Sequence, residues 1–178
     1  MVAIASRDEK KRAGDWRGIQ GNFGPPGEVM DLRGVHGYAT LEELLVDPAI
    51  DLVDLCLPSA LHAPAALAAL GAGKHVLCEK PIALTMAQAN RMLQAAGKAG
   101  RLLMIAHVLP FFPEYAYARG LVSGGKYGRL LGGHFKRIIS DPLWLADFYD
   151  PQKVGGPLVD LHIHDAHFLR MLCGMPQA

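Results

Sequence analysis

Short apolar runs alternate with longer amphipathic stretches over the first two thirds of the chain. The runs have the length and composition of buried strands, and each is followed by residues with helical spacing. Thr40 and Thr85 stand where helix N-caps are expected, ahead of Leu41–Leu45 and Met86–Lys98. This alternation predicts an α/β fold with a Rossmann-type, doubly wound parallel sheet. The expected strands are Val2–Ser6, Val35–Tyr38, Asp51–Leu57, His75–Cys78 and Leu102–His107.

The pattern changes after about residue 120. Glycine-rich turns there surround a possible strand over Leu130–Ile139, and a final helix is expected near Leu158–Leu172. We therefore expect a partial Rossmann-like domain over residues 1–120 and the beginning of an α+β substrate domain over residues 121–178. The Gly/Pro-rich stretch Gly18–Gly34 predicts a surface loop.

Composition narrows the classes of function. With 51% hydrophobic and 20% charged residues, the 178-residue chain should be globular. A net charge of +1 without basic runs argues against nucleic acid as a partner. We expect a cytoplasmic protein, because the N-terminus does not resemble a signal peptide and no apolar run approaches the ~18 residues of a membrane span. The cysteines Cys56, Cys78 and Cys173 lie in apolar runs and are expected to be reduced core thiols.

A dinucleotide site needs a strand that leads into Gly-x-Gly-x-x-Gly at a helix N-terminus, so that the pyrophosphate can approach backbone amides. No glycine group in the sequence has this spacing after a strand. The run from Val2 to Asp8 instead resembles the second strand of such a domain, so the first strand and its glycines are expected upstream of Met1. At the end of that second strand an acid favours NAD. Ser6 and Arg7 tilt the choice between NADP and NAD towards NADP, although an exposed arginine after a strand is also ordinary.

One strand ends in Glu79-Lys80-Pro81. Ligands of open α/β sheets bind at the carboxyl ends of strands, so Lys80 should reach the binding crevice. Pro81 restricts Lys80 to extended backbone and can support a cis bond. The alternative is a solvated lysine at a strand end.

Asp160 and His164 are four residues apart in the final predicted helix and should share a face. A carboxylate beside an imidazole fixes its tautomer and raises its basicity, which suits a general acid/base; a structural hydrogen bond is the alternative. His167 would lie on the same face and make a three-ligand metal site possible. We expect no metal, because the acid/base role already accounts for the first two residues. His107, at the end of the last strand, could reach the crevice or be a buried structural histidine.

These segments together resemble the Gfo/Idh/MocA oxidoreductase family: Gly73-Lys-His-Val, Glu79-Lys80-Pro81, Pro58-Ser-Ala-Leu-His62, and Gly155-Gly156 with Asp160-x-x-x-His164. The resemblance implies that Lys80, Asp160 and His164 are catalytic. It also places Pro58 and His62 along the cofactor crevice, and Glu79 with Lys80 near the nicotinamide ribose. The chain departs from the family at Ser59, where the family usually has Asn, and at His162 and His167, where it has Gly and Asp.

The resemblance implies hydride transfer between NADP or NAD and a hydroxyl or keto carbon of a sugar or cyclic polyol, in a homo-oligomeric enzyme. Two alternatives stay open. One is an NAD-dependent glycoside hydrolase of the same family, and the other is a non-catalytic fragment. We also expect that most of the C-terminal domain lies outside this sequence, together with the glycine-rich first turn.

Overall fold

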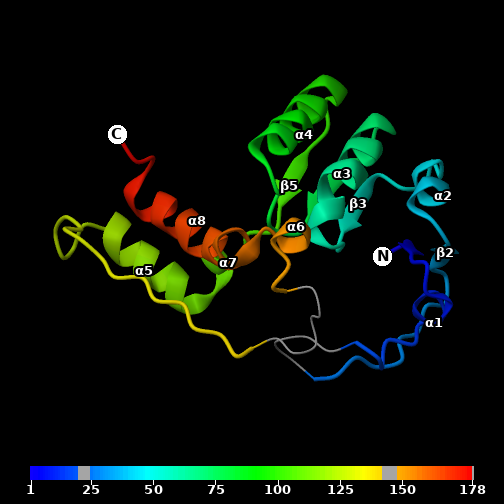
Figure 1. Cartoon of the computed structure of the whole chain (residues 1–178), viewed down its shortest axis with the longest axis horizontal. Helices are drawn as coiled ribbons and strands as arrows, with labels where there is room; N and C mark the ends of the chain where they lie inside the picture. Colours follow the sequence, from blue (N-terminus) through cyan, green and yellow to red (C-terminus); the bar gives the residue numbers. More distant parts are fainter. Residues whose placement is uncertain (20–24, 142–147, 178) are drawn as a thin grey trace.

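The computed structural model describes residues 1–19, 25–141 and 148–177 (Figure 1). All five expected strands are present and pair in parallel, in two sheets. The first sheet contains β1 (Ala3–Ala5) and β2 (His36–Tyr38). The second has the order β3-β4-β5, formed by β3 (Leu52–Leu55), β4 (His75–Cys78) and β5 (Leu103–Ile105).

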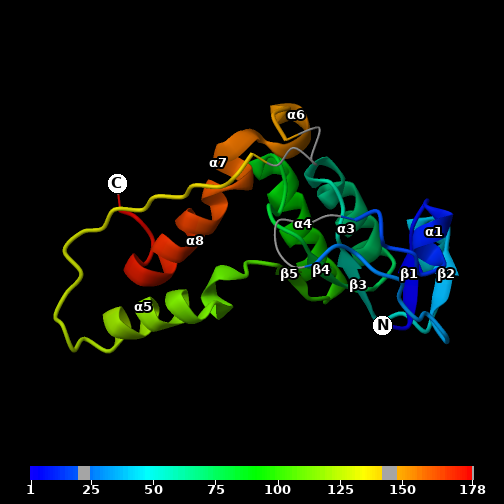
Figure 2. The same ribbon diagram turned by 90° about the horizontal axis from the view of Figure 1, so that it is seen from below.

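The two sheets fit one doubly wound strand order, 3-2-1-4-5-6. In that order β2 and β1 take positions 3 and 2, and β3, β4 and β5 take positions 4, 5 and 6. None of the described strands lies between β1 and β3, which share no ladder and stand apart in Figure 2. The topology agrees with the interpretation of Val2–Ser6 as the second strand of a Rossmann-type domain.

Helices follow the strands as the capping residues predict. They are α1 (Glu9–Arg12), α2 (Leu41–Leu45), α3 (His62–Gly71) after the 3-10 turn η1 (Ser59–Leu61), α4 (Met86–Ala99), and α5 (Pro113–Ser123) after η2 (Leu109–Phe111). Thr40 and Glu43 form a complete capping box at the start of α2, and Thr85 Oγ1 accepts from the backbone N–H of Gln88 at the start of α4. Gly100 ends α4 with φ 61°, a left-handed conformation that costs glycine little.

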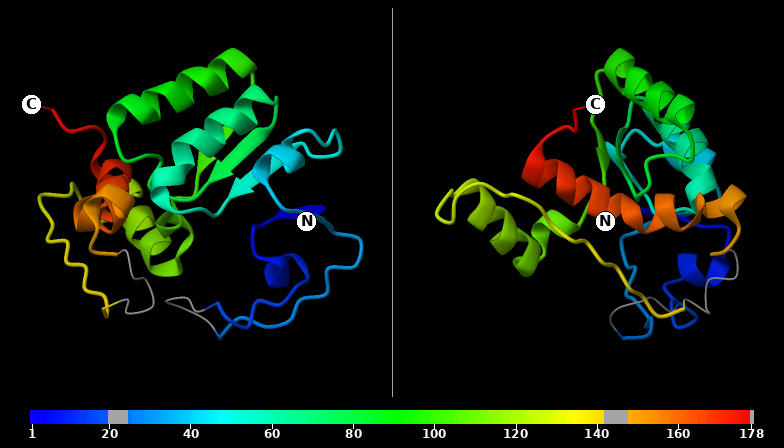
Figure 3. Two further views of the ribbon diagram at one scale, coloured as in Figure 1. Left: turned by 45° about the vertical axis from the view of Figure 1, so that its right-hand side comes forward. Right: turned by 60° about the vertical axis from the view of Figure 1, so that its left-hand side comes forward.

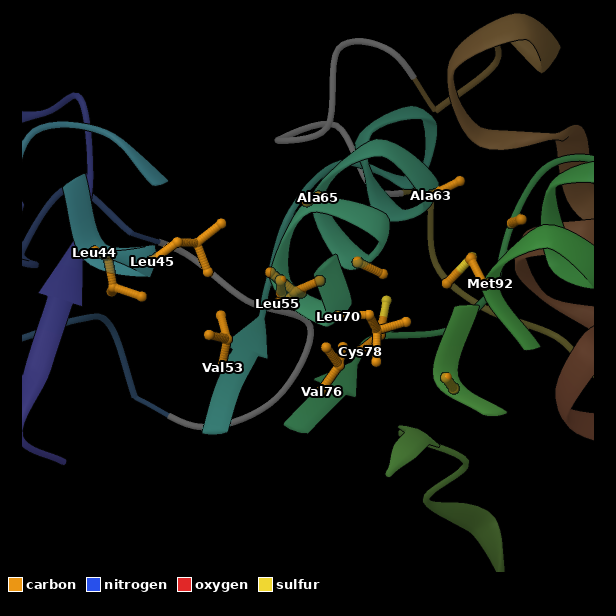
Figure 4. Packing of buried hydrophobic residues seen from close by; sticks show 14 of the residues in the cluster. Leu44, Leu45, Val53, Leu55, Ala63, Ala65, Leu70, Val76, Cys78 and Met92 are labelled. Carbon is orange, nitrogen blue, oxygen red and sulfur yellow. The ribbon is translucent and has the colours of Figure 1, made fainter. Parts of the chain in front are cut away.

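The core lies between the three-stranded sheet and the helices α3 and α4, which cover one of its faces (Figure 3). Strand side chains alternate, so Val53 and Val76 point into this core while Leu52, one residue earlier, is exposed. Leu70 of α3 and Met92 of α4 are fully buried against the strands (Figure 4). The sheet is thereby held rigidly with its carboxyl ends at one edge.

The C-terminal part differs from the expectation in two ways. Instead of one helix near Leu158–Leu172, α7 (Gly156–Asp160) and α8 (His162–Cys173) follow the short α6 (Pro151–Val154), and Leu161 separates α7 from α8. The strand expected over Leu130–Ile139 is wrong: these residues have no regular structure, and no described strand lies beside them to complete a ladder. Residue 120, the expected domain boundary, lies inside α5.

The loop before β2, the cysteines and the helix lengths differ in how far they follow the sequence-based expectations. The described part of the loop Gly18–Gly34 is indeed irregular; residues 20–24 of it lie outside the described residues. Cys78 is buried as expected, but the same expectation is wrong for Cys56 and Cys173, which are exposed free thiols at the ends of β3 and α8. Within the described ranges, no helix combines the length and the hydropathy that crossing a bilayer requires.

Candidate active site

Lys80 stands at the carboxyl end of β4, as the sequence predicts. Its backbone N–H donates to Glu79 Oε2 at 3.2 Å, and the Lys80–Pro81 peptide is cis. The ammonium donates to Asp160 Oδ1 at 2.9 Å and to the Asp160 backbone carbonyl at 2.8 Å. Both side chains are about four-fifths buried, with exposed fractions of 21% and 18%. This contact joins the sheet edge to the end of α7, across 80 residues of sequence.

His62 supports the same edge from inside. It opens α3 and is 1% exposed. Its Nδ1 lies 2.7 Å from the Pro81 carbonyl oxygen, and its Nε2 lies 2.8 Å from the Leu57 carbonyl oxygen. The ring thus connects the segment after β3 with the segment after β4, next to Lys80. Because both nitrogens face backbone, His62 has no polar atom left for a cofactor, and its geometry fits a residue that positions Lys80.

His164 lies in α8, near Lys80, but the hydrogen bond expected from Asp160 does not form. The Asp160 carboxylate accepts from Lys80 instead, and His164 Nδ1 is buried with no hydrogen-bond partner in the described structure. The expected rise in basicity is also wrong. Burial lowers the pKa of His164 to about 4; the charges of Lys80 and Arg137 and the neighbouring His107 act in the same direction, and Asp160 opposes them only weakly.

Arg137 and Asp165 form a second ion pair beside the histidine. The guanidinium donates to both carboxylate oxygens, at 2.9 and 2.6 Å, and the side chains are 20% and 13% exposed. This bidentate pair holds the irregular segment before residue 142 against α8 and lowers the pKa of Asp165. Sequence reasoning missed both residues. Arg137 lay in an expected strand, and no spacing pattern links it to α8.

The remaining predicted site residues lie at two places. Pro58 is exposed at the end of β3, directly before η1, and Glu79 is half-buried beside Lys80. Ser6 and Arg7 follow β1 at the carboxyl end of the other sheet. Ser6 Oγ accepts from the N–H of Asp8, which caps α1, while Arg7 is exposed. No group of three or more His, Cys, Asp or Glu among the described residues could hold a metal ion.

A dinucleotide fits part of this edge. The carboxyl ends of β1, β3 and β4 would face its ribose and nicotinamide groups, through Ser6 and Arg7 at one end and Pro58, Glu79 and Lys80 at the other. The pyrophosphate is different, because it binds at the glycine-rich turn after the first strand of such a fold, and none of the described strands takes that position. The described residues would therefore contact the two ends of such a cofactor, and none of them supplies the glycine-rich turn for its phosphates.

Comparison with known proteins agrees with the fold. Residues 23–107 match the Gfo/Idh/MocA family model, described as an oxidoreductase family with an NAD-binding Rossmann fold. This range includes β2 to β5 and ends at His107. The chain belongs to the Gfo/Idh/MocA family. The resemblance drawn from Glu79-Lys80-Pro81 and its companion segments is thereby confirmed, and so is the Rossmann-type fold.

Relatives of this Gfo/Idh/MocA chain include enzymes named for sugars. It is 36% identical over 135 residues to a 1,5-anhydro-D-fructose reductase of Ensifer adhaerens, covering 75% of the chain and 40% of the relative. It is 30% identical over 179 residues to a D-xylose 1-dehydrogenase (NADP(+)) of Hypocrea jecorina, covering 92% and 42%. The crystal structure of a "probable dehydrogenase" from Thermotoga maritima superimposes with a TM-score of 0.76 at 25% identity, over 99% of this chain and 48% of that one. The chain thus spans less than half the length of each.

The structure places the three residues at which this Gfo/Idh/MocA chain differs from its family. Ser59 is buried at the start of η1. His162 is exposed, and its Nδ1 lies 3.2 Å from Asp165 Oδ2. His167 lies on α8, with its ring against that of His107.

The lowered histidine pKa values make the stability of this Gfo/Idh/MocA protein depend on pH. The pKa of His164 is about 4 in the folded chain and ~6.5 when unfolded, so the unfolded state binds more protons between these values. Stability is therefore complete above the unfolded pKa and decreases as pH falls towards 4. The pKa values of His107 and His167 are lowered as well and add to the effect.

We expect a lower urea midpoint at about pH 5 than at about pH 7. His164→Phe should reduce this difference, because it removes the largest contributor. His36→Phe, at an exposed histidine of β2, should leave the difference as in the wild type. Equal pH dependence in both variants would contradict the assignment to His164.

Proposed function

We propose that this chain carries the reaction centre for reversible hydride transfer between NADP or NAD and a hydroxyl-bearing carbon of a sugar or cyclic polyol. The observation that carries the proposal is the contact of Lys80 Nζ with Asp160, at 2.8 and 2.9 Å, which brings the lysine of the sheet edge beside α8 and His164. The sugar-related names of the relatives support the substrate class. As the resemblance implies, we also propose that the protein acts as a homo-oligomer.

In this proposal each side chain has a separate task. Lys80 donates to the substrate oxygen and stabilises negative charge that develops on it. His164 takes the hydroxyl proton: with a pKa of about 4 its imidazole is neutral near pH 7 and free to accept. The Asp160 carboxylate orients the Lys80 ammonium and stabilises the imidazolium of His164 once the proton is transferred. A bound nicotinamide supplies the hydride acceptor at the same edge.

Cofactor choice depends on the end of β1. Ser6 and the exposed Arg7 suit the 2′-phosphate of NADP, since a guanidinium binds phosphate through charge-assisted hydrogen bonds. We expect Arg7→Ala to weaken NADPH binding about tenfold or more, because such a bond is worth ~1.5–3 kcal/mol. NADH binding should change little. Fluorescence titration of both cofactors checks this, with Arg91→Ala, an exposed arginine of α4, as the matched control.

The activity itself is tested with D-glucose, D-xylose and myo-inositol in the presence of NADP or NAD, and with 1,5-anhydro-D-fructose and NADPH. We expect a change in reduced nicotinamide with at least one of these compounds. Release of sugar from a β-glucoside without net reduction of cofactor would indicate the glycoside hydrolase instead. Cofactor binding without any turnover across the panel would contradict the proposal.

A further inference from the structure

Two histidines that the proposed reaction does not use are stacked beside the site. His107 follows β5, at the carboxyl end of the sheet, and His167 lies on α8, 60 residues later in the chain. Their ring centroids are 4.2 Å apart and the planes differ by 14°. The backbone N–H of His107 donates to the carbonyl of Ile105 at 2.8 Å, which fixes the start of the side chain. Helix α8, which carries both His167 and His164, thus orients the His107 ring through the stacking contact.

One nitrogen of each of these rings, and of His164, has no hydrogen-bond partner in the described part of the protein. Nδ1 of His107, His164 and His167 is buried in each case without a hydrogen-bond partner in the described structure. Leaving such an atom without a partner costs ~1–3 kcal/mol, so several of them together call for a partner such as water or a polar ligand. Lys80 is close enough for its charge to lower the pKa of both His107 and His164. His107 and His164, each with an unsatisfied Nδ1, therefore lie near the lysine that the proposed reaction requires, and His167 stacks on His107.

We propose that His107, held flat against His167, is a further substrate-binding side chain that hydrogen-bonds the hydroxyl next to the reacting carbon. His167 acts through His107 and is a positioning residue. This inference rests on the proposed function, in which Lys80 and His164 engage the reacting oxygen. A neutral imidazole has one nitrogen that donates a hydrogen bond and one that accepts. A hydroxyl group can also donate and accept, so the two groups are complementary.

The charges around the site favour a neutral hydroxyl over an anionic group. The two cations near His164 are already paired, Lys80 with Asp160 and Arg137 with Asp165. Burial, the neighbouring His167 and the charge of Lys80 all lower the pKa of His107, so its ring is uncharged near neutral pH. A carboxylate or phosphate at this position would lie in a partly buried site where both cations near His164 are already paired, and the remaining cation, Arg170, acts on His167 and not on His107.

The test uses D-glucose and 2-deoxy-D-glucose, which differ only in the hydroxyl next to the carbon oxidised by an aldose dehydrogenase. His107→Phe keeps an aromatic ring against His167 and removes both nitrogens. We expect this variant to lower kcat/KM for D-glucose about tenfold, mostly through KM, and to leave kcat/KM for 2-deoxy-D-glucose as in the wild type. His167→Phe should retain more D-glucose activity than His167→Ala, because it keeps the stacked ring.

His36→Phe is the matched control at an exposed histidine. Equal loss on both sugars, or no loss, with His107→Phe would overturn the inference. A second readout is independent of turnover: NMR of ¹⁵N-labelled histidines should show a shift of the His107 ring nitrogens when D-glucose is added with NADP. If the wild type turns over no compound of the panel, the proposed function fails; separately, the absence of that shift would overturn the role of His107.

Discussion

Replacing Lys80 with Met is expected to lower kcat by about two to three orders of magnitude, the usual cost of removing one preorganised donor from a developing oxyanion. The change removes the ammonium that donates to Asp160 at 2.9 Å and, in the proposed reaction, to the substrate oxygen. Binding of NADPH should change far less, because Lys80 is one of several residues along the crevice. Steady-state kinetics and fluorescence titration measure the two effects.

The matched control is Lys98→Met, the same change in the last turn of α4, which should leave kcat unaltered. Loss of Lys80 also leaves the Asp160 carboxylate, 18% exposed, without its cation. Lys80→Met/Asp160→Asn therefore tests whether a fall in activity comes from misfolding: thermal stability should recover and activity should not. Turnover near the wild-type rate in the single variant would exclude Lys80 from the reaction.

Arg137→Met is expected to destabilise the fold by about 2 kcal/mol, since removing one partner of a buried ion pair leaves the other charge uncompensated. The estimate is below the range for fully buried pairs, because Arg137 and Asp165 retain 20% and 13% exposure. The variant loses the two hydrogen bonds, of 2.6 and 2.9 Å, that attach the irregular segment around Arg137 to α8. Urea unfolding monitored by circular dichroism measures the change.

The chain offers a control with the same residue types. Arg33 and Asp31 also form a close ion pair, but with 92% and 58% exposure, so Arg33→Met should leave stability unchanged. In addition, Arg137→Met/Asp165→Leu should recover most of the loss, because it removes both charges together. If the two single variants were equally stable, the buried pair would not contribute as proposed.

The sequence predicted those features that depend on residues close together in the chain. The strands, the caps at Thr40 and Thr85, and the delivery of Lys80 to the end of β4 all follow from periodicity and capping chemistry. Parallel strands place their carboxyl ends together, so the sequence was sufficient to predict the sheet edge that carries Lys80.

The rest of the site depends on contacts between distant residues, which spacing does not reveal. Asp160 and His164 are correctly spaced for one face of a helix, but a lysine 80 residues upstream competes for the carboxylate, and the helix divides at Leu161. The run over Leu130–Ile139 has the composition of a strand, yet a strand needs a partner. The stack of His107 on His167 likewise exists only after folding.

The separation of β1 and β2 from β3, β4 and β5 has a consequence for how this chain unfolds. Among the described residues the two sheets share no backbone ladder; the short helix α2, which contacts β1, β2 and α3, lies between them, and Asp47 accepts from Tyr38 of β2 and from Lys74 before β4. A two-stranded sheet is marginal in water by itself. The chain therefore combines a strongly packed three-stranded unit with a two-stranded one that adds only partly buried side chains, Ala3, Ala5 and Tyr38, to the core. Its melting is expected to lack a single cooperative transition, with the amides of β1 and β2 exchanging well before those of β4.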